Sequence, residues 1–164
     1  YAYFAGKEAL LTMMQAMHRR LAERVLQEGR DPADTPRQAL ERLLTAHLYL
    51  SEVLHAWFYF SYMEAKNLDP RHREEAVAGS RITEEMIAEL LEAGIAAGEF
   101  APRDPRLAAN LIKSLLQNWY LKRSVHVARG VDVDRYAEEL RAVAAGYLRP
   151  AADAALPLPD PRRS

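Results

Sequence analysis

The stretch TPRQALERLLTAHLYL, residues 35–50, contains both a clear helix start and the face by which that helix packs. Thr35 is placed to cap the helix, Pro36 occupies the first turn, where its missing N–H is no loss, and Gln38 completes a capping box. After this start, the residues of one helical face recur at intervals of three or four: Leu40, Leu43, Leu44, His47 and Leu48. We therefore predict a helix that begins at Pro36 and buries this face against other helices.

Comparable starts and stops divide the rest of the chain into helices. In residues 7–28 the apolar positions follow helical spacing and place one stripe along a predicted helix: Leu10, Met14, Met17, Leu21 and Val25. Residues 51–66 are apolar on nearly every side, which indicates a helix buried among others. Asp caps followed by proline predict two further helices, from residue 70 to about 97 and from 105 to about 129, and a last helix follows Asp132. No segment alternates with period two, so we predict an all-α bundle of five or six helices without strands.

Composition narrows the class of protein. The 164 residues are 49% hydrophobic, which suits one domain with a sizeable core. Lys and Arg number 22 against 23 for Asp and Glu, so this part of the protein is not a polyanion-binding body. The absence of cysteine excludes a disulfide scaffold and a thiolate metal site. Because the chain has no cysteine, we also expect it to be cytoplasmic. The longest apolar stretch falls short of the roughly 18 residues that a membrane span needs, so we expect no membrane partner.

The first eleven residues, YAYFAGKEALL, carry the most specific motif. This stretch resembles the end of the DNA recognition helix, and the start of the long helix after it, in regulators of the tetracycline repressor (TetR/AcrR) family. The resemblance implies that Tyr1, Tyr3 and Lys7 contact DNA phosphates and that Phe4 and Leu10 pack. Phenol hydroxyls, an ammonium group and the N-terminal amides of a helix can all hold a phosphate without reading bases.

The resemblance continues, more weakly, along nearly the whole chain. Residues 64–68, and residues 94–100 followed by Asp104-Pro105, are similar to common patterns of the family. It implies a TetR-like helical bundle with three parts: residues 1–6 are the remaining end of a helix-turn-helix, residues 7–148 form an effector-binding and dimerisation domain, and residues 149–164 are a flexible Pro/Ala-rich tail. We therefore expect the other helices of the DNA reader to precede Tyr1.

A regulator of this kind needs a pocket among its central helices. Aromatic walls with a few polar groups suit a mainly apolar small molecule, and the predicted pocket residues are His47, Trp57, Phe60, Tyr62, Met63 and Glu64, faced by Met86 and Trp119. The alternative is that these side chains only pack in the core.

Lys122 and Arg123 follow an apolar run and are also predicted to face the effector. Such a cationic end can hold a carboxylate or phosphate, and residues 118–123 are similar to a pattern in relatives that respond to fatty acids or acyl-coenzyme A esters. Otherwise these cations only complement the dipole of their own helix.

The last two helices are the predicted dimer interface. Leu111 and Leu115 on one helix, with Tyr136, Leu140, Val143 and Tyr147 on the other, are spaced to form a two-fold four-helix interface. The alternative is that these residues face only their own core.

The expected function is a ligand-responsive transcriptional repressor that binds operator DNA as a homodimer and responds to a small-molecule effector. The five histidines have no metal-binding spacing, so we expect no metal and no cofactor. No catalytic motif occurs, and we expect no enzymatic activity. Two alternatives stay open: a helical protein-interaction module that binds neither DNA nor small molecules, and an α-bundle enzyme that processes a small molecule.

Overall fold

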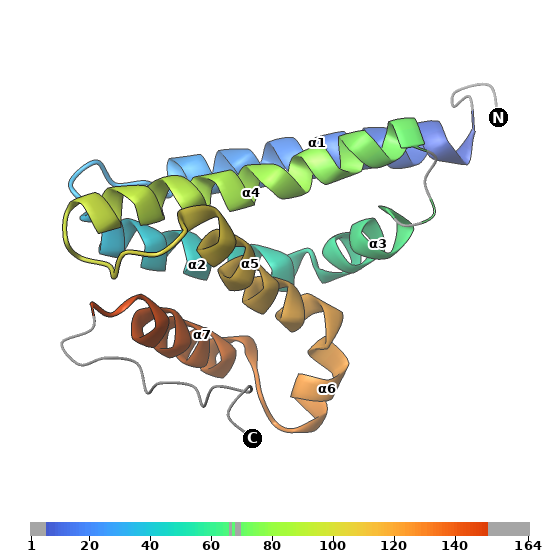
Figure 1. Cartoon of the computed structure of the whole chain (residues 1–164). Coiled ribbons are helices and arrows are strands. Elements are labelled where there is room, and N and C mark those ends of the chain that lie inside the picture. The colour runs from blue at the N-terminus through green and yellow to red at the C-terminus, as the bar shows by residue number, and fades with distance from the viewer. Residues whose placement is uncertain (1–5, 66, 68–69, 151–164) are drawn as a thin grey trace, which may run out of the picture.

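Helices joined by short turns make up the computed structural model, which describes residues 6–65, 67 and 70–150. These ranges contain no strand, so the predicted all-α class is confirmed (Figure 1). The described helices are α1 (Lys7–Glu28), α2 (Pro36–Val53), α3 (His55–Ala65), α4 (Pro70–Ala96), α5 (Pro105–Leu121), α6 (Arg123–Ala128) and α7 (Val133–Leu148).

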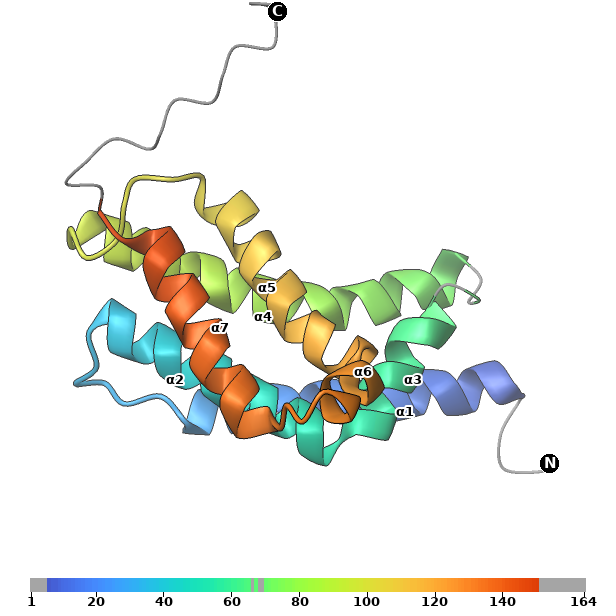
Figure 2. The ribbon, with the colours of Figure 1, turned by 90° about the horizontal axis from the view of Figure 1, so that it is seen from below.

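Two long helices form one layer of the bundle. α1 and α4 lie side by side and run in the same direction, while α2 and then α3 run back beneath them (Figure 1). α5 packs against α4 and α2 and crosses the bundle, and α7 packs against α2 and α5 (Figure 2). The interior is therefore bounded by α1 to α5, and α7 covers the outer side of α2 and α5.

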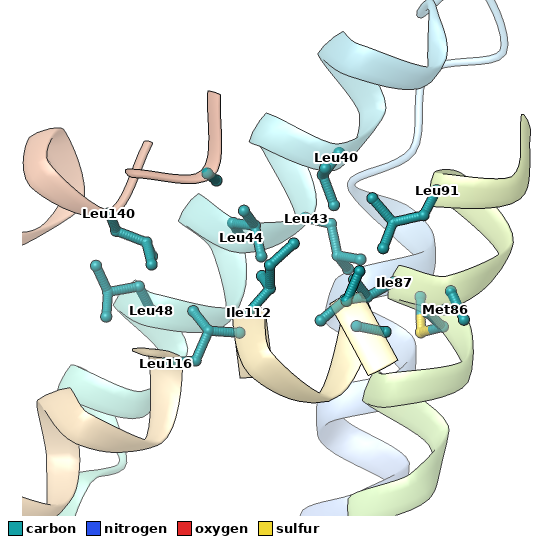
Figure 3. Packing of buried hydrophobic residues seen from close by; sticks show 14 of the residues in the cluster. Leu40, Leu43, Leu44, Leu48, Met86, Ile87, Leu91, Ile112, Leu116 and Leu140 are labelled. Carbon is teal, nitrogen blue, oxygen red and sulfur yellow. The ribbon is translucent and has the colours of Figure 1, made fainter. Parts of the chain in front are cut away.

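The start of α2 is built as its sequence predicts. The Thr35 hydroxyl accepts a hydrogen bond from the Gln38 backbone N–H at 3.3 Å, and the Gln38 side chain accepts one from the Thr35 N–H at 3.0 Å. The predicted face of α2 is buried against α4, α5 and α7, where the core side chains meet (Figure 3): Leu40, Leu43, Leu44, Leu48, Ile87, Leu91, Ile112, Leu116 and Leu140.

The helix boundary expected near residue 51 lies instead at Leu54. Leu54 has φ −105° and ψ 33°, and α3 starts immediately after it. The buried Ser51 hydroxyl donates to the Leu48 carbonyl at 2.7 Å, a local hydrogen bond of the kind that bends helices. His55 Nε2 lies 2.9 Å from the Tyr120 carbonyl oxygen and ties the start of α3 to α5.

The prediction that residues 51–66 are buried on all sides was wrong. Only Phe58 of α3 is buried, and Tyr59, Phe60 and Met63 are exposed. α3 lies beneath the layer of α1 and α4 and contacts α2, α4 and α5 on one side, so its other face is left without neighbours among the described residues (Figure 1). An apolar sequence therefore does not bury this helix.

The single helix expected from residue 105 to about 129 is divided at Lys122. Lys122 has φ −117° and ψ 20°, which ends α5, and α6 turns back toward it. The His126 ring stacks on Trp119 at 5.7 Å between centroids, and His126 Nε2 lies 2.9 Å from Asn118 Oδ1. These contacts between side chains eight or fewer residues apart hold the bend, and no helix breaker in the sequence predicts it.

The turn from α4 to α5 follows the expected Gly and Asp-Pro pattern. Gly98 has φ 73°, a left-handed conformation that favours glycine, and the backbone N–H groups of Glu99 and Phe100 donate to the Gly94 carbonyl. The Asp104 carboxylate then accepts from the first backbone N–H groups of α5. The turn brings the Phe100 ring directly over Gly94, where a Cβ atom would overlap it.

The variant Gly94→Ala is expected to lose about 1–3 kcal/mol of unfolding free energy, because the added methyl group forces the buried Phe100 ring to move. Gly146→Ala is the matched control: it also lies in a helix but has open space around it, so alanine adds about 0.5–1 kcal/mol there. Urea unfolding of both variants measures the difference. Equal stability of the two variants would contradict the packing of Phe100 on Gly94.

Candidate functional site

The interior between α1, α2, α3, α4 and α5 contains a cavity of about 840 Å³. This volume is typical of ligand-binding sites, which range over roughly 300–1,000 Å³. All five helices contribute wall residues. The cavity is thus the candidate functional site in the described part of the chain.

The α1 wall changes in character along the helix. Thr12, Gln15 and Arg19 line the cavity near the start of α1, and Ala22 and Leu26 line it further along. Spacings of three or four place these residues on one face of α1. Thr12 and Leu26 are 14 positions apart, which corresponds to about 21 Å of helix. The cavity is therefore elongated along α1, with polar residues in its first half and Ala22 and Leu26, with Glu23 between them, at its far end.

Two polar atoms in the first half of this wall have no hydrogen-bond partner among the described residues. Thr12 Oγ1 and Gln15 Oε1 are both inaccessible to solvent. Buried polar atoms are normally paired with protein, water or ligand. One turn further along α1, Arg19 Nε lies 3.7 Å from the Glu23 carboxylate, a loose contact. The Thr12 hydroxyl, the Gln15 side-chain NH2 group and the Arg19 guanidinium can donate hydrogen bonds to a carboxylate or another oxygen-rich group, whereas Gln15 Oε1 can only accept one.

A largely buried lysine approaches the cavity from α5. Lys113 Nζ lies 2.6 Å from both the backbone oxygen and the hydroxyl of Ser80 on α4, and 3.4 Å from the Glu84 carboxylate. Burial lowers the pKa of Lys113, and the Glu84 carboxylate partly offsets this shift. With Arg19 and Arg73, the cavity wall carries three cations, and the carboxylates of Glu23 in the wall and of Glu84 beside Lys113 leave an excess of one positive charge. The wall therefore favours an anion over a cation.

Aromatic rings form the side of the cavity near α3. Phe58 lies edge-on to His47 at 5.5 Å between ring centroids and tilted against Tyr120 at 5.2 Å. Tyr62 approaches Tyr120 at 6.5 Å. Burial raises the pKa of the Tyr120 hydroxyl well above its ordinary value, so this hydroxyl stays a neutral hydrogen-bonding group. This wall suits the apolar body of a ligand.

Two of the predicted pocket residues, His47 and Tyr62, line this cavity. The other eight do not: Trp57, Phe60, Met63, Glu64, Met86, Trp119, Lys122 and Arg123. Phe60 and Met63 lie on the exposed side of α3. Met86 is buried in the core, and Trp119 faces α6 and α7 instead of the cavity.

Arg123 is engaged by a carboxylate away from the cavity, and Lys122 is exposed at the end of α5. Arg123 forms two hydrogen bonds to Glu52, at 2.7 and 2.8 Å, and the Trp119 Nε1–H donates to the same carboxylate at 3.0 Å. The Arg123 hydrogen bonds hold the pKa of Glu52 below its usual range. Together these side chains tie α2 to α5 and α6.

The cavity residues of α1 were missed because they do not belong to the apolar stripe by which the sequence predicts this helix. Leu10, Met17 and Leu21 of that stripe are exposed, and the polar face of α1 points inward. The amphipathic rule assumes a dry, filled core. In a helix that lines a polar cavity, the polar face points inward instead of the apolar face. The pattern of Thr12, Gln15 and Arg19 interspersed with alanines was the sequence feature that could have indicated this face.

Exposed apolar side chains remain on the outer side of α5 and α7. Leu111 is 47% and Val143 50% exposed. Tyr136 and Tyr147 are half-buried: the Tyr136 hydroxyl donates to the Leu115 carbonyl at 2.6 Å, and Arg103 lies 4.2 Å from the Tyr147 ring centroid. The expectation for Leu140 is corrected, because this residue is buried in the chain's own core.

The three predicted DNA-contacting residues lie at the N-terminal limit of the described residues, or before it. Tyr1 and Tyr3 lie outside the described residues, and Lys7 is the first residue of α1, with a side chain that also lies outside the description. Within the described ranges, none of the helices combines the length and apolar character that a bilayer span requires.

Comparison with known proteins places the fold. The sequence model of the family "Tetracyclin repressor-like, C-terminal domain" matches residues 33–121. No curated protein matches the chain in sequence.

Solved structures match the described helices over most of their length. A regulatory protein of the TetR family from Rhodococcus RHA1 has a TM-score of 0.81 at 22% identity, over 92% of this chain and 78% of the other. The TetR-family regulator PfmR from Thermus thermophilus has a TM-score of 0.72 at 25% identity, over 93% and 81%. FadR from Bacillus halodurans, a fatty acid degradation regulator, has a TM-score of 0.72 at 21% identity, over 92% and 78%.

The family match spans more than half of the chain, and it includes the capped start of α2, the α4–α5 turn and the cavity walls on α2 to α5. This chain belongs to the tetracycline repressor (TetR) family of transcriptional regulators.

Proposed function

We propose that this chain is the effector-binding and dimerisation part of a transcriptional repressor, and that its effector occupies the cavity between α1 and α5. TetR-family regulators bind operator DNA and small-molecule effectors as homodimers and are not enzymes. The observation that carries the proposal is the cavity of about 840 Å³, whose α1 wall passes from buried polar groups to Leu26.

The proposed effector is an elongated amphipathic anion, of the fatty acid or acyl-ester kind. The Thr12 hydroxyl, the Gln15 side-chain NH2 group and the Arg19 guanidinium would donate to its head group, and the positive charge of Lys113 would attract it. The far end, where Ala22 and Leu26 line the wall and Glu23 pairs with Arg19, would hold its tail. The fold likeness to the fatty acid degradation regulator from Bacillus halodurans agrees with this choice.

The proposed response passes through α1. This helix lines the cavity over about 21 Å, and its first residue is Lys7, at the predicted DNA-contacting segment. An effector that draws Thr12 and Arg19 toward its head group would shift α1 against α4. Because an effector changes DNA affinity only through its different affinity for two states, a coupling of about 1–3 kcal/mol is needed.

The proposed dimer forms through α5 and α7. Leu107, Leu111 and Val143 expose apolar surface on these two neighbouring helices, and α7 lies away from α1 (Figure 1). A two-fold axis there would pair both helices with their copies in a four-helix interface. Each α1 would then lie on the outer side of the dimer, free to move relative to its copy.

The test uses the protein expressed from its whole gene and DNA from the region upstream of that gene. We expect a mobility shift by the dimer that is released by palmitate but not by hexadecanol or by a cationic amine with the same tail. Failure to bind any upstream DNA would contradict the repressor. Release by the amine and the carboxylate alike would contradict the anionic head group.

A further inference from the structure

A second, smaller cavity lies beside the far end of the first. Its volume is about 290 Å³, and it is formed by α1, α2 and α4 with the turn after α1. Leu43, Ala46 and Leu90 provide apolar wall. Leu26, which is 3% exposed, lines both cavities, and no other described residue does so.

The helices around Leu26 place the two cavities in line. On α4, Thr83 lines the first cavity and Leu90 the second, and the buried Met86 lies between them on the same helical face. On α2, the first cavity reaches His47 and the second begins one residue earlier, at Ala46. The second cavity thus continues the first in the direction of α1 and α4, with Leu26 and Met86 between the two.

We infer that Leu26 sets the length of the apolar tail that the effector site accepts, and that the second cavity is a tail subsite which Leu26 closes. This inference rests on the proposed function, because it requires an effector whose head lies near Thr12 and whose tail points along α1. A tail that reaches Leu26 meets a branched, buried side chain with empty space behind it. Tail length, and not only head-group charge, then decides which effectors bind.

The test measures calorimetric affinities of straight-chain carboxylates, from octanoate to stearate, for the chain and its Leu26 variants. Each methylene group that the cavity buries raises the affinity about fourfold. For the unsubstituted chain this gain is expected to stop at one tail length, where the tail meets Leu26. The variant Leu26→Ala opens the way to the second cavity, so the gain should continue to longer tails. Leu26→Phe adds atoms at the same position and should stop the gain at a shorter tail.

The matched control is Leu91→Ala. Leu91 is also fully buried but lines neither cavity, so the same deletion should leave the preferred tail length unchanged. Thermal unfolding without ligand shows whether each variant folds. If Leu26→Ala does not fold, Leu26→Phe still tests the inference, because the larger side chain fills space where alanine would leave a void.

The outcomes separate this inference from the proposed function. If carboxylates bind but both Leu26 variants keep the tail preference of the unsubstituted chain, the role of Leu26 is overturned and the effector class stands. If the folded, unsubstituted chain binds no carboxylate of any length, the proposed effector class is overturned and the tail subsite with it.

Discussion

The double variant Leu111→Glu, Val143→Glu is expected to be monomeric at concentrations where the unsubstituted protein is a dimer. Both side chains are about half exposed on neighbouring helices of the single chain, and the proposed interface covers them. Enclosing an unpaired carboxylate costs several kcal/mol. We therefore expect the dimer dissociation constant to rise by at least about a hundredfold, which corresponds to roughly 2.7 kcal/mol.

Analytical ultracentrifugation over a concentration series measures this change. Leu21→Glu is the matched control, because Leu21 is 45% exposed on α1, on the other side of the bundle from α7. The control should remain dimeric. If the double variant remains a dimer, or if Leu21→Glu also dissociates the dimer, the proposed α5–α7 interface is contradicted.

The second large effect is expected at Lys113. In the variant Lys113→Met, affinity for a long-chain carboxylate should fall by about 10-fold to 150-fold, because two opposite unit charges about 6–11 Å apart attract each other by about 1.5–3 kcal/mol at an effective dielectric constant of about 20. Affinity for the corresponding alcohol should change little. Lys113 is mostly buried, and the two Ser80 oxygens and the Glu84 carboxylate already engage its three N–H donors, so it would act on the effector through its charge.

The pH dependence of binding tests the same residue. Burial lowers the pKa of Lys113, and only its protonated form attracts an anion. Carboxylate affinity of the unsubstituted protein should therefore fall as pH rises through this lowered pKa, below the range in which an exposed lysine titrates. The variant Lys113→Met should lack that decline.

Lys122→Met is the matched control for both measurements. Lys122 is exposed at the end of α5 and does not line the cavity, so its loss should change neither the affinity nor the pH dependence. Equal effects of the two substitutions would show that Lys113 acts only through the net charge of the protein.

Local sequence determined most of the helix boundaries. The Thr35 capping box, the Asp104-Pro105 start and the left-handed Gly98 act within a few residues of the chain, and each is found where the sequence predicts it. The core face of α2 was also predictable, because Leu40 to Leu48 face a dry, filled interior.

Tertiary structure decided the two helix breaks and the composition of the candidate site. Besides the contacts of His126 with Trp119 and Asn118, the bend at Lys122 is held by hydrogen bonds from Arg123 to Glu52 on α2, which no local pattern shows. The Leu54 bend turns α3 so that its aromatic residues divide between cavity and surface.

The candidate site itself could not be predicted from the apolar stripe of α1. The sequence alone establishes an all-helical TetR-family chain with capped α2 and α5 and a leucine-rich core, because caps and periodicity are local properties. Which face of α1 points inward depends on whether the enclosed space is filled or empty. Here the enclosed space is a cavity, so Thr12, Gln15 and Arg19 face inward while Leu10, Met17 and Leu21 face outward. The orientation of α1 is therefore decided only by the packing of five helices around that cavity.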